Sequence, residues 1–173
     1  MTIYTIKPLG PDTWDDFARL IERQGNGSMG APFCWCTNFH PPDPDDNRSS
    51  EGRRAYKEQL VSQGRAHAAL VFDGDLAVGW CQYGSPEELP GIHHRKDYEA
   101  GLVTLPHYRL TCIYVDKAYR KRGVAAAALQ GALDLIGNAG GGVVEGYPHD
   151  IPEGKKMSAS FLYNLTRSVY EQA

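Results

Sequence analysis

The chain has 173 residues, 42% of them apolar and 23% charged, and its formal net charge is −3 at neutral pH. A chain of this length usually forms one domain whose core needs no metal or disulfide, so we expect a single domain over residues 1–173. The negative charge disfavours general binding to nucleic acid or to a membrane surface, and no apolar run reaches the roughly 18 residues of a membrane span. The N-terminus lacks a basic region followed by an apolar one, and four cysteines without a secretion signal indicate reduced thiols. These features predict a cytoplasmic protein.

The first part of the chain predicts a strand, a helix and a long loop. Residues 2–7 are rich in β-branched side chains, as strands are. A helix is expected from Asp12 or Thr13 to Gly25, because its apolar residues recur on one face. The stretch after it, up to residue 49, is punctuated by Gly and Pro. Long loops in compact domains are usually functional or disordered, and the aromatic residues here argue against disorder.

The middle of the chain predicts a helix followed by a hairpin. The helix begins near Ser50 and continues to about Gln63. Two apolar runs, at residues 66–72 and 76–83, read as strands. An Asp-Gly turn joins them, which is a strong hairpin signal.

The last part of the chain predicts alternating strands and helices after a long polar connection. The elements are a connection at 84–106, a strand at 109–115, a helix at 123–136 that Gly137 ends, a short strand at 142–148 and a helix at 161–173. This order predicts an α/β (α+β) domain with a mixed, mostly antiparallel sheet flanked by helices and with one parallel crossover.

Four basic residues crowd around one glycine at the start of the helix predicted at 123–136. They are Lys117, Arg120, Lys121 and Arg122. A helix start already carries partial positive charge, so cations there are unfavourable unless an anion binds. Gly123 lets the backbone approach a ligand closely, and Ala125 adds only a methyl group. The amides of the first turn can then donate to an anion such as a pyrophosphate. The alternative is a solvated basic turn before an alanine-rich packing helix.

The usual nucleotide-binding loops are missing from the sequence. There is no Gly-x-x-x-x-Gly-Lys-Ser/Thr loop, and no Gly-x-Gly-x-x-Gly follows a strand. Gly140-Gly141-Gly142 reads as a simple loop between a helix and a strand.

The pattern Val115-x-x-x-x-Arg120-x-x-Gly123-x-Ala125 resembles the acetyl-CoA signature of the GNAT N-acetyltransferase superfamily. Lys117 stands where many members have Pro, but the order of elements from residue 2 to 173 adds to the resemblance. The resemblance implies acetyl-CoA as co-substrate and no metal. It also implies that the backbone near Ile113 and Val115 holds the pantetheine arm, while the pyrophosphate is bound by Arg120, Lys121, Arg122, Gly123, Val124 and Ala125.

The same resemblance implies direct transfer of the acetyl group to a primary amine, here of a small molecule. Tyr170 would protonate the departing thiolate, since the family often has a tyrosine on its last helix; the alternative is that Tyr170 only packs that helix. Asn164 and Ser168 on the same helix would contact the pantetheine. A non-catalytic acyl-CoA sensor and a protein N-acetyltransferase are the alternative functions.

Glu145 is the candidate general base, because it is an acid inside a strand next to the expected acetyl site. A carboxylate partly removed from water can accept a proton directly or through water. The alternative is a glutamate in solvent or in a structural pair. His107 and Asp116 are lesser candidates. Cys112 would permit an acetyl-cysteine intermediate, but a buried, inert thiol is the favoured interpretation.

The strip FCWCTNFH at residues 33–40 predicts part of an acceptor pocket. Cys34, Cys36 and His40 have a poor spacing for zinc, and no second ligand pair follows. Phe33 and Trp35 would line the acceptor side, or else anchor the loop to the core. Trp80 and Gln82 would complete the wall, and strand alternation puts them on one face.

The family usually continues after its last helix with Gly-Phe and two more strands, whereas this sequence stops at Ala173. The resemblance therefore predicts a missing C-terminal strand pair, or a partner that supplies the pairing, as in a homodimer. An unpaired sheet edge favours such association.

Overall fold

The computed structural model describes residues 3–25, 34–152, 154–155 and 164–173. Its centre is one five-stranded sheet in the order β1-β2-β3-β4-β5. The first four strands pair antiparallel, and β5 pairs parallel to β4. The strands are β1 (Thr5–Pro8), β2 (His67–Asp73), β3 (Leu76–Gly84), β4 (Tyr108–Val115) and β5 (Val144–Gly146).

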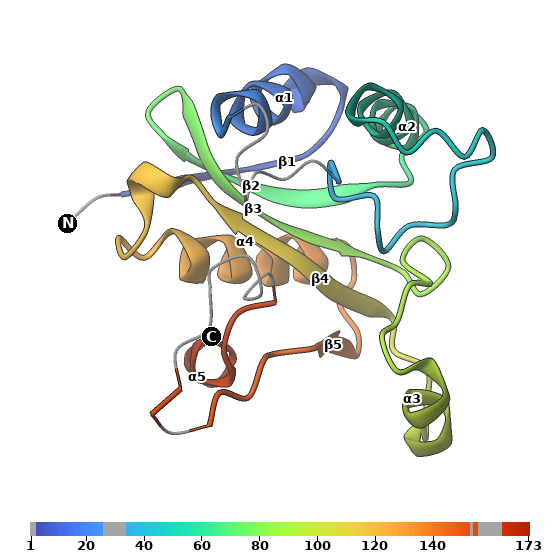
Figure 1. Ribbon diagram of the computed structural model, residues 1–173. Coiled ribbons are helices and arrows are strands. Elements are labelled where there is room, and N and C mark those ends of the chain that lie inside the picture. The colour runs from blue at the N-terminus through green and yellow to red at the C-terminus, as the bar shows by residue number, and fades with distance from the viewer. Residues whose placement is uncertain (1–2, 26–33, 153, 156–163) are drawn as a thin grey trace.

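Helices cover both faces of this sheet. Figure 1 shows α1 and α2 above it and α4 below it, with α5 beside β5 and α3 at the lower corner. The helices are α1 (Trp14–Arg23), α2 (Ser50–Ser62), α3 (Arg95–Gly101), α4 (Val124–Asn138) and α5 (Arg167–Gln172). Two short 3-10 turns, at Pro11–Thr13 and Lys117–Tyr119, precede α1 and α4. No helix in these ranges is long and apolar enough to cross a membrane.

The predicted fold class is confirmed, and two of the predicted elements need correction. The connection predicted at 84–106 contains α3, whose seven residues are too few to show helical periodicity. An ion pair between Arg95 and Glu99, one turn apart, supports it. The last helix begins at Arg167, after an extended N-cap at Thr166, and so later than predicted; residues 161–163 lie outside the described ranges.

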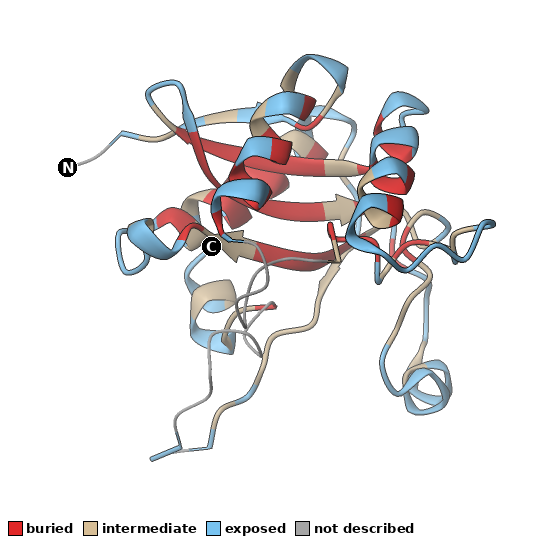
Figure 2. Cartoon of the chain, turned by 45° about the horizontal axis from the view of Figure 1, so that its top comes forward, coloured by how far each residue is buried: buried red, intermediate tan, exposed pale blue. Residues whose placement is uncertain are grey.

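Two apolar layers hold the sheet between its helices. On the α1 and α2 face, the core includes Phe17, Leu60 and Trp80, all at most 2% exposed. On the α4 face, Leu129 and Ile136 pack with residues of β2, β3 and β4. Figure 2 shows burial concentrated along the strands and on the sheet-facing sides of the helices. The central strands β2, β3 and β4 are therefore buried on both faces, whereas the edge strand β1 is largely exposed and β5 is half-buried.

Two glycines of α4 provide a test of this packing. Gly137→Ala is expected to raise the free energy of unfolding by about 0.5–1 kcal/mol, because a Cβ there meets nothing within 4 Å and glycine weakens helices. Gly131→Ala is expected to lower it, since the new Cβ would lie 2.8 Å from Cγ2 of Ile6. Urea denaturation of both variants measures the two changes. Equal effects would contradict the packing of α4 against β1.

Candidate active site

The pairing of β4 with β5 stops after three residue pairs. The last of them joins Leu110 to Gly146. Immediately beyond it, the register of β4 with β3 slips, since Tyr83 pairs with Leu110 whereas Cys81 pairs with Ile113. Thr111 and Cys112 therefore lie opposite the single residue Gln82, which is a β-bulge.

A bulge bends its strand and frees a backbone group from the ladder, and bulges are frequent beside active sites. Here the bulge lies where the two parallel strands part. We call this place the fork. It lies between Leu110–Cys112 of β4 and Gly146–Tyr147 at the end of β5. The sequence does not predict the bulge, because a bulge leaves no trace in the apolar pattern.

The turn that leads from β4 into α4 has the conformation expected of an anion site. We call residues 117–123 the basic turn. Gly123 has φ +80°, and a Cβ built on it would meet nothing within 4 Å. The first helical hydrogen bond runs from Ala127 N–H to Gly123 O (3.0 Å), so the amides of residues 124–126 have no partner within the helix. The backbone at this position can therefore approach a phosphate and donate to it.

The predicted pyrophosphate residues surround this backbone. Arg120, Lys121 and Arg122 are exposed, and Lys121 also has a positive φ of 60°. Tyr4 Oη donates to the carbonyl of Arg122 (3.1 Å), which fastens the turn to the strand end of β1. Two further predicted residues face inward, because Val124 and Ile113 are buried between α4 and the sheet. Only their backbones are suited to contact a ligand, while Val115 and Ala125 are half-buried at the same end of the sheet.

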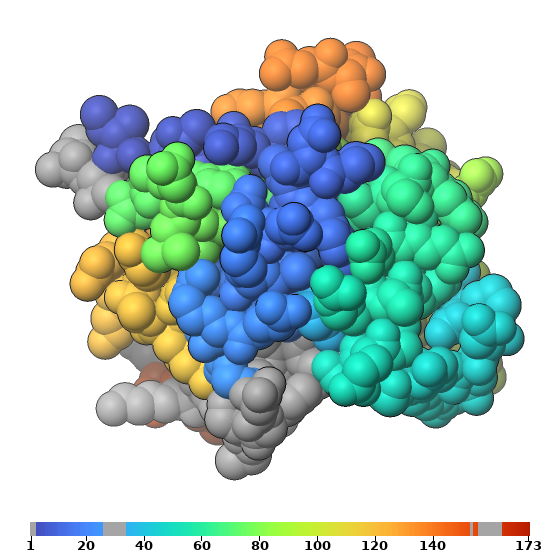
Figure 3. Space-filling view, turned by 90° about the horizontal axis from the view of Figure 1, so that it is seen from above, coloured from blue at the N-terminus to red at the C-terminus, as the bar shows by residue number. Residues whose placement is uncertain are grey.

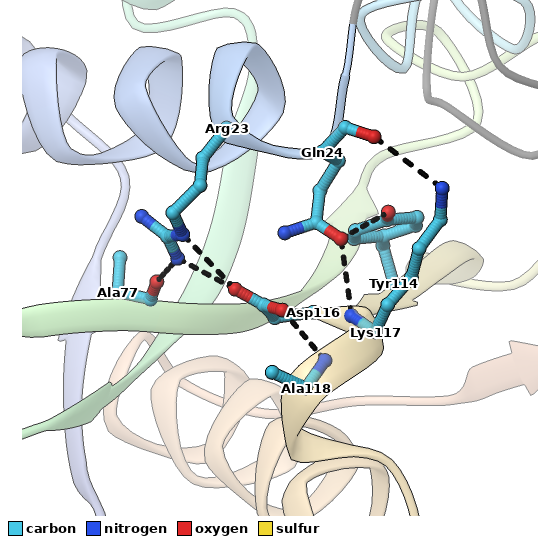
Figure 4. Close-up of polar contacts among 7 residues, drawn as sticks. All are labelled: Arg23, Gln24, Ala77, Tyr114, Asp116, Lys117 and Ala118. Atoms are coloured by element: carbon cyan, nitrogen blue, oxygen red, sulfur yellow. Dashed lines mark hydrogen bonds and ion pairs between the residues drawn. The ribbon is translucent and has the colours of Figure 1, made fainter.

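A network of polar contacts fixes the start of the basic turn (Figure 4). Asp116 accepts from Ala118 N (2.9 Å) and from Arg23 Nη2 (2.8 Å) and Nε (3.1 Å). Gln24 Oε1 accepts from Tyr114 Oη (3.1 Å) and from Lys117 N (3.0 Å). Arg23 and Gln24 belong to the end of α1, so this helix and the basic turn are bonded together.

Asp116 is not suited to act as a base. Burial raises the pKa of its carboxyl, but the Ala118 amide and the Arg23 guanidinium outweigh burial and hold that pKa below its usual value. An ionised carboxylate that already accepts three hydrogen bonds is a structural group. His107, the other lesser candidate, accepts at Nδ1 from Val143 N (3.0 Å), beside the start of β5.

The Arg23–Asp116 pair should leave a signature in the pH dependence of stability. Because the folded-state pKa of Asp116 is lowered, its contribution is present above the unfolded pKa of about 3.9 and is lost as the pH falls through the folded pKa. Arg23→Met is therefore expected to cost about 2 kcal/mol at pH 7, and less below pH ~4. Arg19→Met is the control, since its pair with Asp16 is exposed and should contribute almost nothing. Urea titrations at several pH values measure both, and a pH-independent loss for Arg23→Met would contradict the assignment.

Tyr170 lies at the fork. Its ring covers Gly146, whose hypothetical Cβ would be 2.2 Å from Tyr170 Cε1. The hydroxyl is buried and has no hydrogen-bond partner among the described residues. Burial, with a smaller effect of Cys81, raises the pKa of Tyr170 well above its usual value, so the phenol carries its proton. A buried hydroxyl without a partner is costly and points to a group supplied from outside.

Asn164 is a second buried group of this kind. It is 4% exposed, and its Oδ1 has no partner among the described residues. It precedes α5, so it does not share that helix with Ser168 as predicted. A buried amide oxygen fits a chain of amide N–H donors such as pantetheine. The open backbone at Gly123 and the helix amides suit a phosphate group, and the Asn164 oxygen suits an amide donor.

Glu145 lies on β5 and its carboxylate is held by two tyrosines. Tyr98 Oη (2.8 Å) and Tyr147 Oη (3.0 Å) both donate to Oε2. Burial and the bond to Glu145 raise the pKa of Tyr147, which keeps it a donor. The carboxylate lines a pocket of about 520 Å³, together with Asp97 and Tyr98 of α3 and with residues 101–104 at the end of that helix. Neighbouring residues on β5 point to opposite faces, so Glu145 and Tyr170 approach the fork from opposite sides.

Tyr98 and Arg109 belong to the surroundings of Glu145, although the sequence pattern does not predict either of them as a site residue. Arg109 is buried, pairs in register with Glu145, donates to the carbonyl of Leu89 (2.8 Å) and lies 5.5 Å from the ring centre of Tyr98. The only signal was an arginine inside an otherwise apolar strand. Tyr98 has no such signal, since it lies in α3, a helix too short to show helical periodicity.

The residues expected to line the acceptor pocket lie deeper than predicted. Phe33 is outside the described residues. Trp35 is 3% exposed and stacks on Trp14 at 6.1 Å, and Trp80 is fully buried with its ring 5.0 Å from that of Phe17. This arrangement favours an anchor in the core over a pocket wall for both tryptophans. Strand alternation is confirmed, since Trp80 and Gln82 face α1 and α2 whereas Cys81 and Tyr83 face α4.

Cys34, Cys36 and His40 of the same strip do not converge as metal ligands. In the described part of the chain, no three His, Cys, Asp or Glu side chains converge as metal ligands. His40 Nε2 instead accepts from Lys57 Nζ (2.9 Å) and its Nδ1 donates to Glu88 O (2.9 Å). All four cysteines are free thiols.

Comparison with known proteins agrees with this geometry. The sequence model of the Acetyltransferase (GNAT) family matches residues 35–145. A search of curated protein sequences found no match. Among solved structures, a probable acetyltransferase is 17% identical, with 97% of this chain and 87% of that chain covered and a TM-score of 0.56.

Two further solved structures share the fold. An aminoglycoside N-acetyltransferase in complex with CoA is 15% identical, covers 86% of this chain and 80% of its own, and has a TM-score of 0.52. An aminoglycoside acetyltransferase from an uncultured soil metagenomic sample, in complex with trehalose, is also 15% identical, with 94% and 97% covered and a TM-score of 0.50. The predicted resemblance is thereby confirmed, and the chain belongs to the acetyltransferase (GNAT) family.

Proposed function

We propose that the protein is an acetyl-CoA-dependent N-acetyltransferase that moves the acetyl group directly from the thioester to a primary amine of a small molecule. The fork carries this proposal. Two parallel strands part beside a bulge, one of them leads into a helix start with amides that are unbonded within the helix, and a protonated buried phenol covers Gly146. This arrangement supports binding a long thioester at one end by its phosphates and at the other by its acyl group.

The CoA-binding part of the proposal uses the basic turn and the last segment of β4. The amides of Gly123, Val124 and Ala125 would bind the pyrophosphate, with Arg120, Lys121 and Arg122 around it; charged hydrogen bonds of this kind are worth about 1.5–3 kcal/mol each. The pantetheine would follow the backbone of Ile113 and Val115, and Asn164 Oδ1 would accept one of its amide protons. The thioester would then reach the bulge.

In the transfer step, the amine nitrogen attacks the thioester carbon and the carbon–sulfur bond breaks. An N–H that the bulge frees near Thr111 and Cys112 is placed to donate to the oxyanion. Tyr170, buried and protonated, gives its proton to the leaving thiolate. Glu145 accepts the proton that the amine must lose, directly or through one water, and the hydroxyls of Tyr98 and Tyr147 hold its carboxylate in place.

The pocket beside Glu145 supports a cationic acceptor of limited size. Amines are ammonium ions at neutral pH, and the carboxylates of Asp97 and Glu145 complement that charge. Its volume of about 520 Å³ is in the usual range for small-molecule sites. Two solved relatives of the same fold are aminoglycoside acetyltransferases, which makes polycationic amines the first acceptors to try.

The direct test is a thiol-release assay with acetyl-CoA and a panel of polyamines, aminoglycosides, simple amines and peptides. We expect thiol release that requires an amine, with a product heavier by one acetyl group in mass spectrometry. Calorimetry with CoA alone tests the first half of the proposal. If the folded protein takes up neither CoA nor acetyl-CoA, the proposal is wrong.

Glu145→Gln tests the assignment of the base. We expect kcat/KM to fall by about 100-fold and the acidic limb of the pH–rate profile to disappear, because the amide keeps the two tyrosine hydrogen bonds but cannot take a proton. Asp97→Asn is the control and should raise KM with little change in kcat. If Glu145→Gln changes only KM, Glu145 binds the acceptor and another group is the base.

A further inference from the structure

Lys57 is a buried lysine without a carboxylate partner. It lies on α2, is 1% exposed, and donates from Nζ to the carbonyl of Cys36 (3.4 Å), to His40 Nε2 and to Gln82 Oε1. Burial and the Lys57 charge lower the pKa of His40 to about 2, so its ring is neutral. All three acceptors are thus uncharged, and none of the ion pairs of the described residues includes Lys57. Burial lowers the pKa of Lys57, while the charge of Cys36 and of two further cysteines raises it, so the ammonium form of Lys57 depends on an anion nearby.

The group beside Lys57 that can become an anion is the thiol of Cys36. Cys36 Sγ accepts from Trp80 Nε1 at 3.1 Å and from the thiol of Cys112. Burial raises the pKa of Cys36, but the Cys112 hydrogen bond, the Lys57 charge and the Trp80 hydrogen bond together lower it overall. The other three cysteines shift the other way, and burial raises the pKa of Cys34 to about 11. Cys36 is therefore the thiol of the four that loses its proton most readily.

This cluster is connected to the fork. Cys112 is one of the two bulge residues of β4, and Gln82 joins Lys57 to the other by donating from Nε2 to Thr111 Oγ1 (3.0 Å). On its other side, Cys36 follows Trp35 in a strained turn, with φ values of 56° and 48°. Positive φ at non-glycine residues costs about 1–2 kcal/mol each and tends to be kept at functional sites. A covalent change at Cys36 and Cys112 would thus act directly on the acetyl site.

We infer that Cys36 and Cys112 form a hydroperoxide-reactive thiol pair whose disulfide switches off acetyl transfer. Cys36 thiolate attacks the terminal oxygen of the hydroperoxide, the O–O bond breaks, and the leaving alkoxide takes the proton of the Lys57 ammonium. Cys112 then attacks the sulfur of the Cys36 sulfenic acid, the S–O bond breaks, and water leaves with the thiol proton. Two thiols are oxidised, the peroxide is reduced to an alcohol and water, and Lys57 is left neutral without its counter-ion.

The test uses the full chain and hydrogen peroxide, followed by intact mass and peptide mapping without reductant. We expect a loss of two hydrogens and one linked pair of peptides, joining Cys36 to Cys112. Cys34→Ser should give the same link at the same rate, and Cys112→Ser should stop at a sulfenic acid that dimedone traps on Cys36. A link between Cys34 and Cys36, or a reduced Cys112, would overturn the inference.

The role of Lys57 has its own readout. Lys57→Met is expected to slow disulfide formation at least 10-fold. The wild-type rate is also measured against pH, because this readout does not depend on whether Lys57→Met folds. A thiolate that is already formed gives a rate that is flat from pH 6 to 8, whereas an ordinary thiol gains about tenfold per pH unit. A rate that rises in that way would refute the Lys57–Cys36 pair.

The effect on catalysis rests on the proposed function, whereas the disulfide does not. Oxidised protein is expected to lose at least 90% of its amine-dependent thiol release and to recover it with dithiothreitol. If the disulfide forms but turnover is unchanged, the coupling to the fork is wrong. If reduced protein shows no turnover at all, the proposed function fails while the mass result stands by itself.

Discussion

Tyr170→Phe is expected to lower kcat by about 100-fold or more while the Kd for CoA changes less than about twofold. A positioned general acid contributes about 10²–10⁴ to the rate, and the phenylalanine ring still fills the space over Gly146. Removing a buried hydroxyl that has no partner among the described residues should not destabilise the fold. Steady-state kinetics, calorimetry and thermal denaturation on the same sample separate these effects.

The control for Tyr170 is Tyr83→Phe. Tyr83 belongs to the same apolar layer but lies on β3, where it pairs with Leu110, so the variant makes the same chemical change one strand away from Gly146. Gly146→Ala approaches the position from the other side, because the new methyl group must displace the Tyr170 ring, and it should reproduce the loss of kcat. Full activity in Tyr170→Phe would show that the tyrosine only packs α5 and that the thiolate is protonated by another group.

Ala125→Glu is expected to weaken CoA binding by about 100-fold without weakening the fold. The side chain enters the first turn of α4, where an acidic group is favourable for the helix by about 0.3–1 kcal/mol. The same negative charge would repel the pyrophosphate and compete for the amides, at a cost of one or two charged hydrogen bonds of about 1.5–3 kcal/mol each. Calorimetry measures the affinity for CoA, and a melting curve measures the stability of the fold.

A matched change elsewhere separates charge from position. Ala55→Glu adds the same side chain at an exposed site of α2, on the opposite face of the sheet, and should leave the CoA affinity unchanged. Loss of binding in both variants would indicate a general charge effect. Unaltered binding in Ala125→Glu would mean that the anion does not reach the start of α4.

The sequence predicted the fold well where local chemistry decides the outcome. The start of α4 was found because glycine, cations and an alanine run each have a local meaning, and the hairpin was found from its Asp-Gly turn. The bulge at Thr111 and Cys112 was not found, because it depends on how β4 pairs with β3. The burial of Trp35 was not settled either, since an aromatic residue suits a pocket wall and a core equally well.

The buried polar cluster was out of reach for the same reason. Lys57 appears in the sequence as one charged residue in an amphipathic helix, and such residues are usually solvated. Only the tertiary structure brings it to His40 and Gln82, 17 and 25 residues away along the chain. Residues whose role depends on long-range contacts carry no local pattern that could announce them.

The bond between Arg23 and Asp116 joins positions 93 residues apart in the sequence. This contact makes the structure of the basic turn depend on residues of α1, and a mutational screen can detect that dependence. A screen for variants with poor use of acetyl-CoA should return substitutions at the end of α1, although no phosphate would ever touch that helix. Substitutions of Arg23 and Gln24 should then have the same phenotype as substitutions in the basic turn. A second substitution that restores activity to one of these sites should be found in the other.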